Sequence, residues 1–340
     1  MPQTAKLLLI IGSDREDRMK VSGGQLNIGA STDLHLLVGR DLPLHRTLMT
    51  RNFFRQQRAP DLFGYECILN LITEAEENGR VLDNLRKFIR GYPGKVVNRP
   101  EAVLQSTRDL VARKLAGIPG LVVPRVLRLR DGKTDVAQMV DRAGLNFPVI
   151  VRRVGTHTGR IVGRFDDMDA LRAAKIGEGE HLATEFVDFR SADGLYRKHR
   201  VFFLGPRRVF RHMLVSDDWN VHASDRQRVM AEEPELIAAE ERMFASVDGA
   251  FAEDVQQVLC AVRERMPLGF FGMDFGIASD GRVVLFEANA TMNFFPLSPD
   301  PRFAYLARCV EPARRAFYEL LGVPDEPVAA AARTQAHSAL

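Results

Sequence analysis

Cysteine is scarce in this chain of 340 residues, and the cysteines that occur are far apart. Cys67, Cys260 and Cys309 are odd in number and show no CxxC spacing. Such a set argues against a disulfide framework and against a zinc site built on paired cysteines. We therefore expect a protein of the reducing cytoplasm, where a lone cysteine is most often a small buried hydrophobe.

A long hydrophobic run is also missing. The apolar segment from Leu7 to Ile11 is far shorter than a signal-peptide core or a membrane span, and no longer run follows. We expect a soluble protein with no membrane partner.

The sequence has no excess of charge of one sign. Lysine and arginine number 47, aspartate and glutamate number 44, and the formal net charge is +3. No basic stripe with interleaved aromatic residues occurs, so nucleic acid is not an expected partner. With 46% apolar and 27% charged residues the composition is that of a globular protein, and the length predicts two or three domains.

Strand and helix patterns alternate over the first part of the chain. The predicted strands are Lys6–Ile11, Leu34–Val38, Tyr65–Asn70 and Lys95–Val97. Arg80–Ile89 has the apolar spacing of a helix. Such alternation predicts a small open parallel sheet, and so an α/β unit.

The rest of the chain has an α+β pattern. A β-rich unit begins at Phe147, and Lys198–Leu204 with Arg208–Val215 predicts an antiparallel meander. The predicted helices are Glu101–Ala116, Asp167–Ala174, Glu232–Arg265 and Arg302–Leu321. The expected units are residues 1–100, 101–187 and 188–326, followed by a disordered tail over 327–340.

The most informative segment is a predicted hairpin around Asp280-Gly281, a dipeptide that suits a two-residue turn. Counting back along both strands from that turn places Asp274 directly opposite Glu287. Asn289, two residues further on, points to the same side. Two opposed carboxylates repel unless a cation lies between them, and two carboxylates with an amide suit Mg²⁺, with Mn²⁺ as an alternative. The competing interpretation, an exposed hairpin with scattered acids, is disfavoured by the apolar residues of both strands.

Three other segments carry weaker signals. The Gly-rich turn from Gly155 to Gly159 follows Arg152 and has Thr156, His157 and Thr158 at its centre, so its backbone amides could approach a phosphate. Taken alone, this segment is more often a plain turn, and no Walker A lysine follows. Lys198 and Arg200 share one strand face, which is either solvated or a cationic wall completed by Arg211. Trp219 and Asn220, and Thr291 and Asn293 after the hairpin, are candidate substrate contacts or ordinary packed loops.

In their order these segments resemble the ATP-grasp superfamily of carboxylate–amine ligases, over most of the chain. Phe147-Pro-Val-Ile-Val-Arg152 is similar to the family's FPVVVK strand, and Gly155–Gly159 to its mobile phosphate loop. Thr184-Glu185-Phe186-Val187 is similar to the hinge strand that holds adenine. Arg200-Val-Phe resembles the strand whose arginine faces the acyl phosphate, and Asp274 with Glu287-Ala-Asn289 resembles the magnesium motif.

The resemblance implies a role for each matched residue. The implied ATP contacts are Arg152, Gly155, Thr156, His157, Thr158, Gly159, Glu185, Phe186, Val187 and Lys198. The implied metal ligands are Asp274, Glu287 and Asn289, and the implied catalytic residues are Arg200 and Arg211. Asn98-Arg-Pro and Arg108-Asp109 also resemble the family's entry into its first ATP-grasp helix. The chain departs from the pattern at Arg152, which replaces a lysine, at Lys198, which replaces an aspartate, and in its short phosphate loop.

The leading hypothesis from the sequence is therefore an ATP-dependent ligase that forms an amide through an acyl phosphate. Its cofactors would be ATP and Mg²⁺, and its partners a small carboxylate and an amine such as amino acids or peptides. A kinase and a non-catalytic nucleotide-binding regulatory module are the alternatives. The identity of the two substrates cannot be read from the residues, and homodimers, common in the family, are supported here by no particular residue.

Overall fold

A computed structural model describes most of the chain. It covers residues 7–15, 19–22, 25–28, 32, 34, 36–38, 42, 44–56, 61–130, 135–155, 161–292, 294 and 297–323, without the side chains of 19–22 and 25–28. Thr156, His157, Thr158, Gly159 and Asn293, and the predicted tail over 327–340, lie outside these residues.

The N-terminal part forms a four-stranded parallel sheet, here called the N-terminal sheet. Its strand order is β4 (Leu44–Met49), β1 (Leu7–Gly12), β5 (Cys67–Asn70) and β6 (Lys95–Val97). Successive residues of β1 enter two different cores, because both faces of this strand are covered. The remaining elements of this part are β2 (Met19–Ser22), β3 (Gln25–Ile28), α1 (Phe53–Gln56) and α2 (Gly79–Phe88).

Two sequence predictions in this region are wrong. The expected strand Leu34–Val38 contains a turn, because the amides of Leu37 and Val38 both donate to the carbonyl of Leu34. The expected helix Glu101–Ala116 is two helices, α3 (Pro100–Leu104) and α4 (Arg108–Leu115). Thr107 between them has extended backbone angles, with φ −65° and ψ 152°, which end one helix and allow the next to begin.

The second sheet, here called the small sheet, is antiparallel. Its order is β10 (Ile161–Phe165), β9 (Val149–Arg153), β11 (His181–Glu185) and β8 (Val126–Leu129). Helices α5 (Val136–Ala143) and α6 (Met168–Ala173) cover one face with a compact apolar core. Because strand side chains alternate, Arg128, Arg152 and Thr184 point away from that core.

The third sheet, here called the large sheet, has five strands. Its order is β13 (Arg207–Ser216), β12 (Tyr196–Leu204), β14 (Phe270–Ile277), β15 (Val283–Asn289) and β7 (Leu121–Val122). The first four strands are antiparallel, and β7 pairs in parallel with β15. The other elements are α7 (Asp225–Arg228), η2 (Met230–Glu232), α8 (Pro234–Met243), α9 (Glu253–Arg265), η3 (Pro301–Cys309) and α10 (Val310–Leu321).

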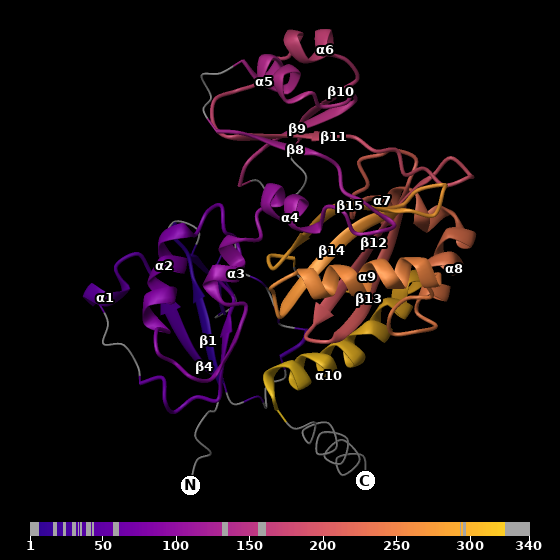
Figure 1. Cartoon of the computed structure of the whole chain (residues 1–340). Helices are drawn as coiled ribbons and strands as arrows, with labels where there is room; N and C mark the ends of the chain where they lie inside the picture. Colours follow the sequence, from indigo (N-terminus) through magenta and orange to yellow (C-terminus); the bar gives the residue numbers. More distant parts are fainter. Residues whose placement is uncertain are drawn as a thin grey trace, which may run out of the picture.

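Figure 1 shows the three sheets as separate bodies around α4, with the small sheet above the other two. Helix α10 runs beneath the large sheet, and its residues share an apolar core with β1 and β5. Within the part of the chain that the structure describes, no helix has the length and apolar character needed to cross a membrane. The predicted combination of a parallel N-terminal sheet with α+β units is confirmed, whereas the exact unit boundaries stay predictions.

Candidate active site

The hairpin β14–β15 places Asp274 opposite Glu287, as predicted, but by a different route. The loop has three residues instead of two, since Ala278 pairs with Arg282 through an N–H···O bond of 2.9 Å. That extra residue shifts the register by one position. A bulge in β15 between the partners of Asp274 and Phe275 shifts it back, so the two carboxylates face each other after all.

Asp274 is bound by a guanidinium from the neighbouring strand. The Nε and Nη2 atoms of Arg200 donate to its two carboxylate oxygens at 2.5 and 2.7 Å. Both side chains are almost fully buried, with 4% of Asp274 and 8% of Arg200 exposed. Lys198 Nζ lies 3.9 Å from Asp274 Oδ2 and donates to the carbonyl of Val221 at 2.7 Å. The predicted strand face therefore carries both cations and points at the acid.

Glu287 is bound by Arg108, a residue to which the sequence gave no role in the site. Arg108 Nη1 donates to the carbonyl of Phe286 at 2.5 Å, and Nη2 forms an ion pair with the Glu287 carboxylate. Burial alone would raise the pKa of Glu287. The nearby positive charges, above all those of Arg108 and Arg200, instead lower this pKa to about 2. Arg108 is 179 positions away in sequence. The only signal in the sequence was the resemblance of Asn98-Arg-Pro and Arg108-Asp109 to the family's entry into its first ATP-grasp helix.

Arg152 belongs to the same cluster. The adjacent charge of Arg108, followed by burial, lowers its pKa to about 9, and Glu287 opposes the shift. Its buried Nε atom has no hydrogen-bond partner. The structure thus brings together five predicted residues from three strands of the large sheet and one of the small sheet. They are Arg152, Lys198, Arg200, Asp274 and Glu287.

The chemistry of these oxygen donors fits a hard divalent cation. Two carboxylates stand on directly opposed positions of neighbouring strands, and oxygen ligands are what Mg²⁺ prefers. Asn289 lies opposite Gly272, but its Oδ1 accepts bonds from the amides of Thr291 and Met292 at 2.9 and 3.1 Å. No group of three His, Cys, Asp or Glu side chains suited to a metal occurs among the described residues. A metal here would depend on the two carboxylates and the amide.

The predicted hinge residues contact both the small-sheet part and the main apolar core. Glu185 Oε1 accepts bonds from the backbone and side-chain nitrogens of Asn146 at 2.8 and 3.1 Å. The Phe186 amide donates to the carbonyl of Pro148 at 2.8 Å. Val187 packs against the main apolar core. Gly155, the first residue of the predicted phosphate loop, has φ +70°, a conformation that favours glycine.

Trp219 lies at the hinge and not beside the carboxylates. Its ring is edge-on to Phe186, with centroids 5.6 Å apart, and the guanidinium of Arg164 lies 4.2 Å from the Phe186 ring centroid. The amide of Asn220 donates to Asp218 Oδ1 at 2.8 Å within the same loop. These two candidate substrate residues thus belong to one loop, which contacts the end of the small-sheet part through Trp219.

The loop after β15 contacts the N-terminal sheet. Thr291 Oγ1 donates to the carbonyl of Thr73 at 2.9 Å, and Thr32 Oγ1 donates to the carbonyl of Ala290 at 2.6 Å. Thr73 follows β5 at the carboxyl edge of the parallel sheet, where open α/β sheets bind ligands. Thr291 is therefore placed where the N-terminal sheet meets the carboxylate pair.

Arg211 reaches the site face through a second bulge. Val201 pairs with Phe210 and Arg200 with His212, so Arg211 is the extra residue of β13. It is buried, and its guanidinium lies 5.2 Å from the ring centroid of Phe294. Burial and the nearby charge of Arg200 lower its pKa.

An open pocket lies between α4, the small sheet and β15. Its lining residues are Ser106, Arg108, Val111, Ala112, Val123, Pro124, Val126, Thr184, Leu285, Phe286, Glu287, Ala288 and Asn289. Its lining is mostly apolar and includes the charged residues Arg108 and Glu287.

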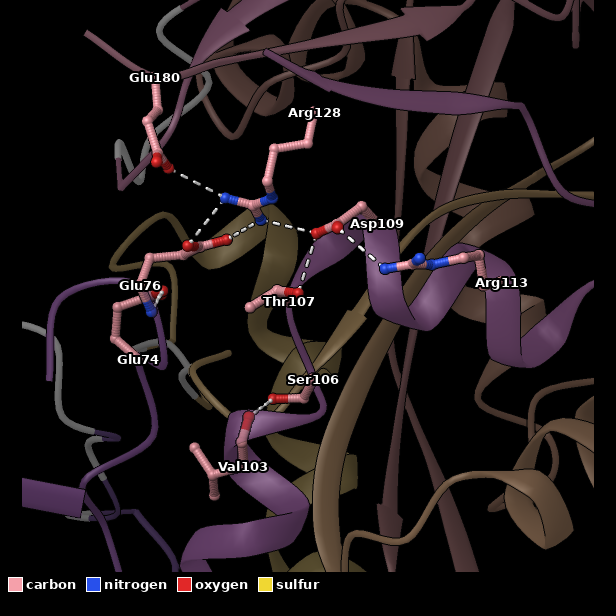
Figure 2. A network of polar contacts seen from close by, with 9 residues as sticks. All are labelled: Glu74, Glu76, Val103, Ser106, Thr107, Asp109, Arg113, Arg128 and Glu180. Atoms are coloured by element: carbon pink, nitrogen blue, oxygen red, sulfur yellow. Dashed lines mark hydrogen bonds and ion pairs between the residues drawn. The ribbon is translucent and has the colours of Figure 1, made fainter. Parts of the chain in front are cut away.

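Figure 2 shows a polar network beside this pocket, centred on Arg128 of β8. The guanidinium binds Glu76 from the loop after β5, Asp109 of α4 at 2.6 Å, and Glu180 of the small-sheet part at 3.3 Å. Arg113 Nη2 contacts Asp109 from the other side at 3.4 Å. One side chain thus joins the small sheet to α4 and to the N-terminal sheet.

Comparison with known proteins places the fold. No family model matches the chain, and no curated protein matches it in sequence. Among solved structures, a RimK-domain ATP-grasp protein from Sphaerobacter thermophilus DSM 20745 superposes with a TM-score of 0.50 at 16% identity, covering 93% of this chain and 99% of that one. The VanG D-Ala:D-Ser ligase from Enterococcus faecalis gives 0.50 at 12% identity, covering 93% and 100%.

A third neighbour is the macrocyclase MdnC from Microcystis aeruginosa MRC, bound with the precursor peptide MdnA. It has a TM-score of 0.50 at 12% identity and covers 93% of this chain and 99% of its own. The three proteins match this chain over almost their full lengths. The arrangement of three sheets described above is therefore that of known ATP-grasp proteins, and the chain has the ATP-grasp fold.

Proposed function

We propose that the protein is an ATP-dependent ligase that joins a carboxylate to an amine and releases ADP and phosphate. One observation carries the proposal. Asp274 and Glu287 are opposed on paired strands and are surrounded by guanidinium and ammonium groups, and Glu287 lines an open pocket. Acidic residues for a metal beside basic residues for phosphates are what phosphoryl transfer requires.

The residues divide into two roles. Asp274, Glu287 and Asn289 would hold Mg²⁺, which supplies neutralising charge to the nucleotide phosphates when bound. Arg152 and Lys198 would bind phosphate oxygens from either side, since both belong to the charge cluster around Glu287. Most of the rate acceleration would come from positioning and fixed charge.

The reaction has two steps. An oxygen of the substrate carboxylate attacks the γ-phosphorus, ADP departs, and an acyl phosphate forms. The amine nitrogen then attacks the acyl carbon, inorganic phosphate leaves, and the nitrogen loses a proton. Arg200 and Arg211 lie on the face of β12 and β13 nearest to this chemistry and would stabilise the acyl phosphate.

Amino acids and peptides are the proposed substrate class. Two of the structural neighbours are a D-Ala:D-Ser ligase and a macrocyclase bound with a precursor peptide. Thr291 at the carboxyl edge of the N-terminal sheet and Trp219 at the hinge are the proposed substrate contacts.

The test is ADP release from ATP and Mg²⁺ with panels of amino acids, small acids and peptides, followed by mass spectrometry of the products. We expect an amide product that forms with one ADP per bond, and at least about a hundredfold slower release with Asp274→Asn. Asp254→Asn, at an exposed position of α9, is the matched control. A product that retains phosphate would indicate a kinase. The proposal fails if no combination releases ADP while Asp274→Asn binds ATP as tightly as the wild type.

A further inference from the structure

A buried histidine on the site face has no role in the reaction proposed above. His212 of β13 lies directly opposite Arg200 of β12, and Arg200 lies directly opposite Asp274 of β14. Directly opposed residues of paired strands share a face, so these three side chains form one row across the large sheet. His212 is 7% exposed, and its buried Nε2 atom has no hydrogen-bond partner. Such an atom is either enclosed by apolar rings or completed by a ligand.

The bulge in β13 surrounds the His212 ring with positive charge. Arg211 is the extra residue of that bulge and lies beside His212 on the site face. Burial is the first cause that holds the pKa of His212 well below 6.5, and the charges of Arg200 and Arg211 follow. Arg226 of α7 adds to the same effect. The imidazole is therefore neutral at physiological pH and can donate a hydrogen bond from within a group of cations.

The carboxylates near this ring are already bound to arginines. Asp274 accepts bonds from two nitrogens of Arg200, and the fully buried Glu240 accepts bonds from two nitrogens of Arg226. Lys198, on the same strand face, adds a further positive charge and is 17% exposed, so this face reaches solvent. Among the described residues around the ring, positive charges outnumber negative ones, and the local potential favours an anion.

A second buried histidine shows what a purely structural ring is like in this sheet. His199 precedes Arg200 on β12 and points to the opposite face, and its buried Nδ1 also has no hydrogen-bond partner. Its ring stacks on Phe275 and meets the edge of Phe251, so apolar rings enclose it. His212 instead has cations as its neighbours. The difference in surroundings favours a ligand for His212 and none for His199.

We propose that His212 binds a second, non-reacting carboxylate of the acid substrate, and that the enzyme therefore uses a dicarboxylic acid. This inference rests on the proposed function. The reacting carboxylate belongs beside Asp274 and Arg200, and His212 lies one strand further along the row, about 5 Å away. Short dicarboxylic acids such as succinate and glutarate, or aspartate and glutamate, hold their two carboxylates at a separation of this order. One carboxylate then reacts while the other is held.

The experiment compares the binding of glutarate and pentanoate by calorimetry, with Mg²⁺ and the imido analogue of ATP, which is not hydrolysed. Pentanoate has the carbon chain of glutarate but lacks the second carboxylate. We expect wild-type protein to bind glutarate at least about tenfold more tightly, because only glutarate completes the charge-assisted bond to His212. In His212→Leu this preference should disappear through weaker glutarate binding, with pentanoate unchanged. A purely structural role of His212 would weaken the binding of both acids equally.

Two further variants separate hydrogen bonding from folding. His212→Gln keeps a neutral N–H donor near the position of Nε2, so it should retain part of the preference for glutarate. His199→Gln changes an equally buried ring on the opposite face and should leave the preference intact. Thermal unfolding of each variant identifies any that fail to fold, and the wild-type preference is measured without any substitution.

Glutamate and glutarate distinguish the two sources of a second carboxylate. Tighter binding of either one than of pentanoate supports the inference. Tighter binding of glutamate than of glutarate assigns the second carboxylate to an amino acid, and the reverse order assigns it to an acid without an ammonium group.

The outcomes distinguish this inference from the proposed function. If wild-type protein binds none of these dicarboxylates more tightly than pentanoate, the inference is overturned, and the ligase proposal stands as long as another acid supports ADP release. If glutarate or glutamate binds through His212 but no amine leads to ADP release from ATP, the carboxylate site stands and the ligase proposal fails. An unchanged preference for glutarate in a folded His212→Leu also overturns the inference.

Discussion

Among single residues, His199 shows how the site strand is anchored. Its ring stacks on Phe275, with centroids 5.3 Å apart, and meets the edge of Phe251 at 5.6 Å. Because strand side chains alternate, this buried ring points away from the site while Lys198 and Arg200 point toward it. Its buried Nδ1 has no hydrogen-bond partner, so the neutral form suits this environment.

We predict that His199 makes the stability of the protein depend on pH. Burial lowers its pKa from 6.5 to about 4, so between these values the unfolded chain binds a proton that the folded chain does not. The resulting contribution to the free energy of unfolding is fully present above pH 6.5 and is lost as the pH falls toward 4. The total loss is on the order of 3 kcal/mol. In denaturant titrations at several pH values, His199→Phe should lose less stability on acidification than the wild type. His45→Gln, at an exposed position, is the control, and an unchanged pH profile in His199→Phe would contradict the prediction.

The sequence predicted some of these residues because their signals are local. Asp274, Glu287 and the face of Lys198 and Arg200 follow from strand alternation and from one turn, within short stretches of chain. Arg108 could not be predicted in the same way, because it meets Glu287 only after α4 has packed against β15. The hydrogen bonds that the Asn289 side chain accepts from its own loop could not be predicted either, because they depend on the turn that follows the strand.

At the scale of elements, the hairpin β14–β15 contains two irregularities that cancel. The loop holds one residue more than the predicted turn, and β15 holds one residue more than its partner strand. Phe286, at the bulge, packs against the backbone of Gly276 and presents its carbonyl to Arg108. The position of Glu287 opposite Asp274 therefore depends on the bulge as well as on the turn.

Two glycine variants should separate stability from site geometry. In Gly276→Ala the new Cβ would lie 2.7 Å from Phe189 and 2.9 Å from Phe286, so the bulge must shift. Gly281→Ala meets no atom within 4 Å, and its strain comes only from φ +84°. Each change should cost about 1–2 kcal/mol of stability in chemical denaturation. Only Gly276→Ala should also weaken ADP binding with Mg²⁺, and equal ADP affinity in the two variants would count against this role of the bulge.

The prediction of strands and helices succeeded where apolar runs are continuous. It failed where tertiary contacts determine the local backbone conformation. The strands β1, β5 and β6 were found from buried runs. The segment Leu34–Val38 has a similar composition but turns back on the carbonyl of Leu34. Apolar composition alone does not distinguish a strand from a turn that is packed against a core.

At the scale of the whole molecule, Arg128 links the small sheet to the rest of the protein. Its side chain is 12% exposed. Among its three acidic partners, Glu76 is 19% exposed and Asp109 is 10% exposed, whereas Glu180 is 45% exposed. The contact with Glu76 connects two sheets, and the contact with Glu180 stays within one part of the chain (Figure 2).

We predict that Glu76→Gln loosens the small sheet and that Glu180→Gln does not. Losing the charge-assisted bond across the sheets should cost about 1–2 kcal/mol of local stability. Hydrogen exchange of the amides in β8 and in the segment after β5 should accelerate in Glu76→Gln without nucleotide. The more exposed Glu180 should change exchange by little, since an exposed pair contributes about 0–1 kcal/mol. A larger acceleration of hydrogen exchange in Glu180→Gln than in Glu76→Gln would contradict the prediction.

The position of the only tryptophan has a practical consequence. Trp219 belongs to the loop after β13, and the ring it touches, Phe186, ends the small-sheet part of the chain. Any rotation of the small sheet relative to the large sheet changes the surroundings of this single indole. The protein therefore carries an intrinsic optical probe, and stopped-flow emission after ligand mixing would report any such rotation without an attached dye.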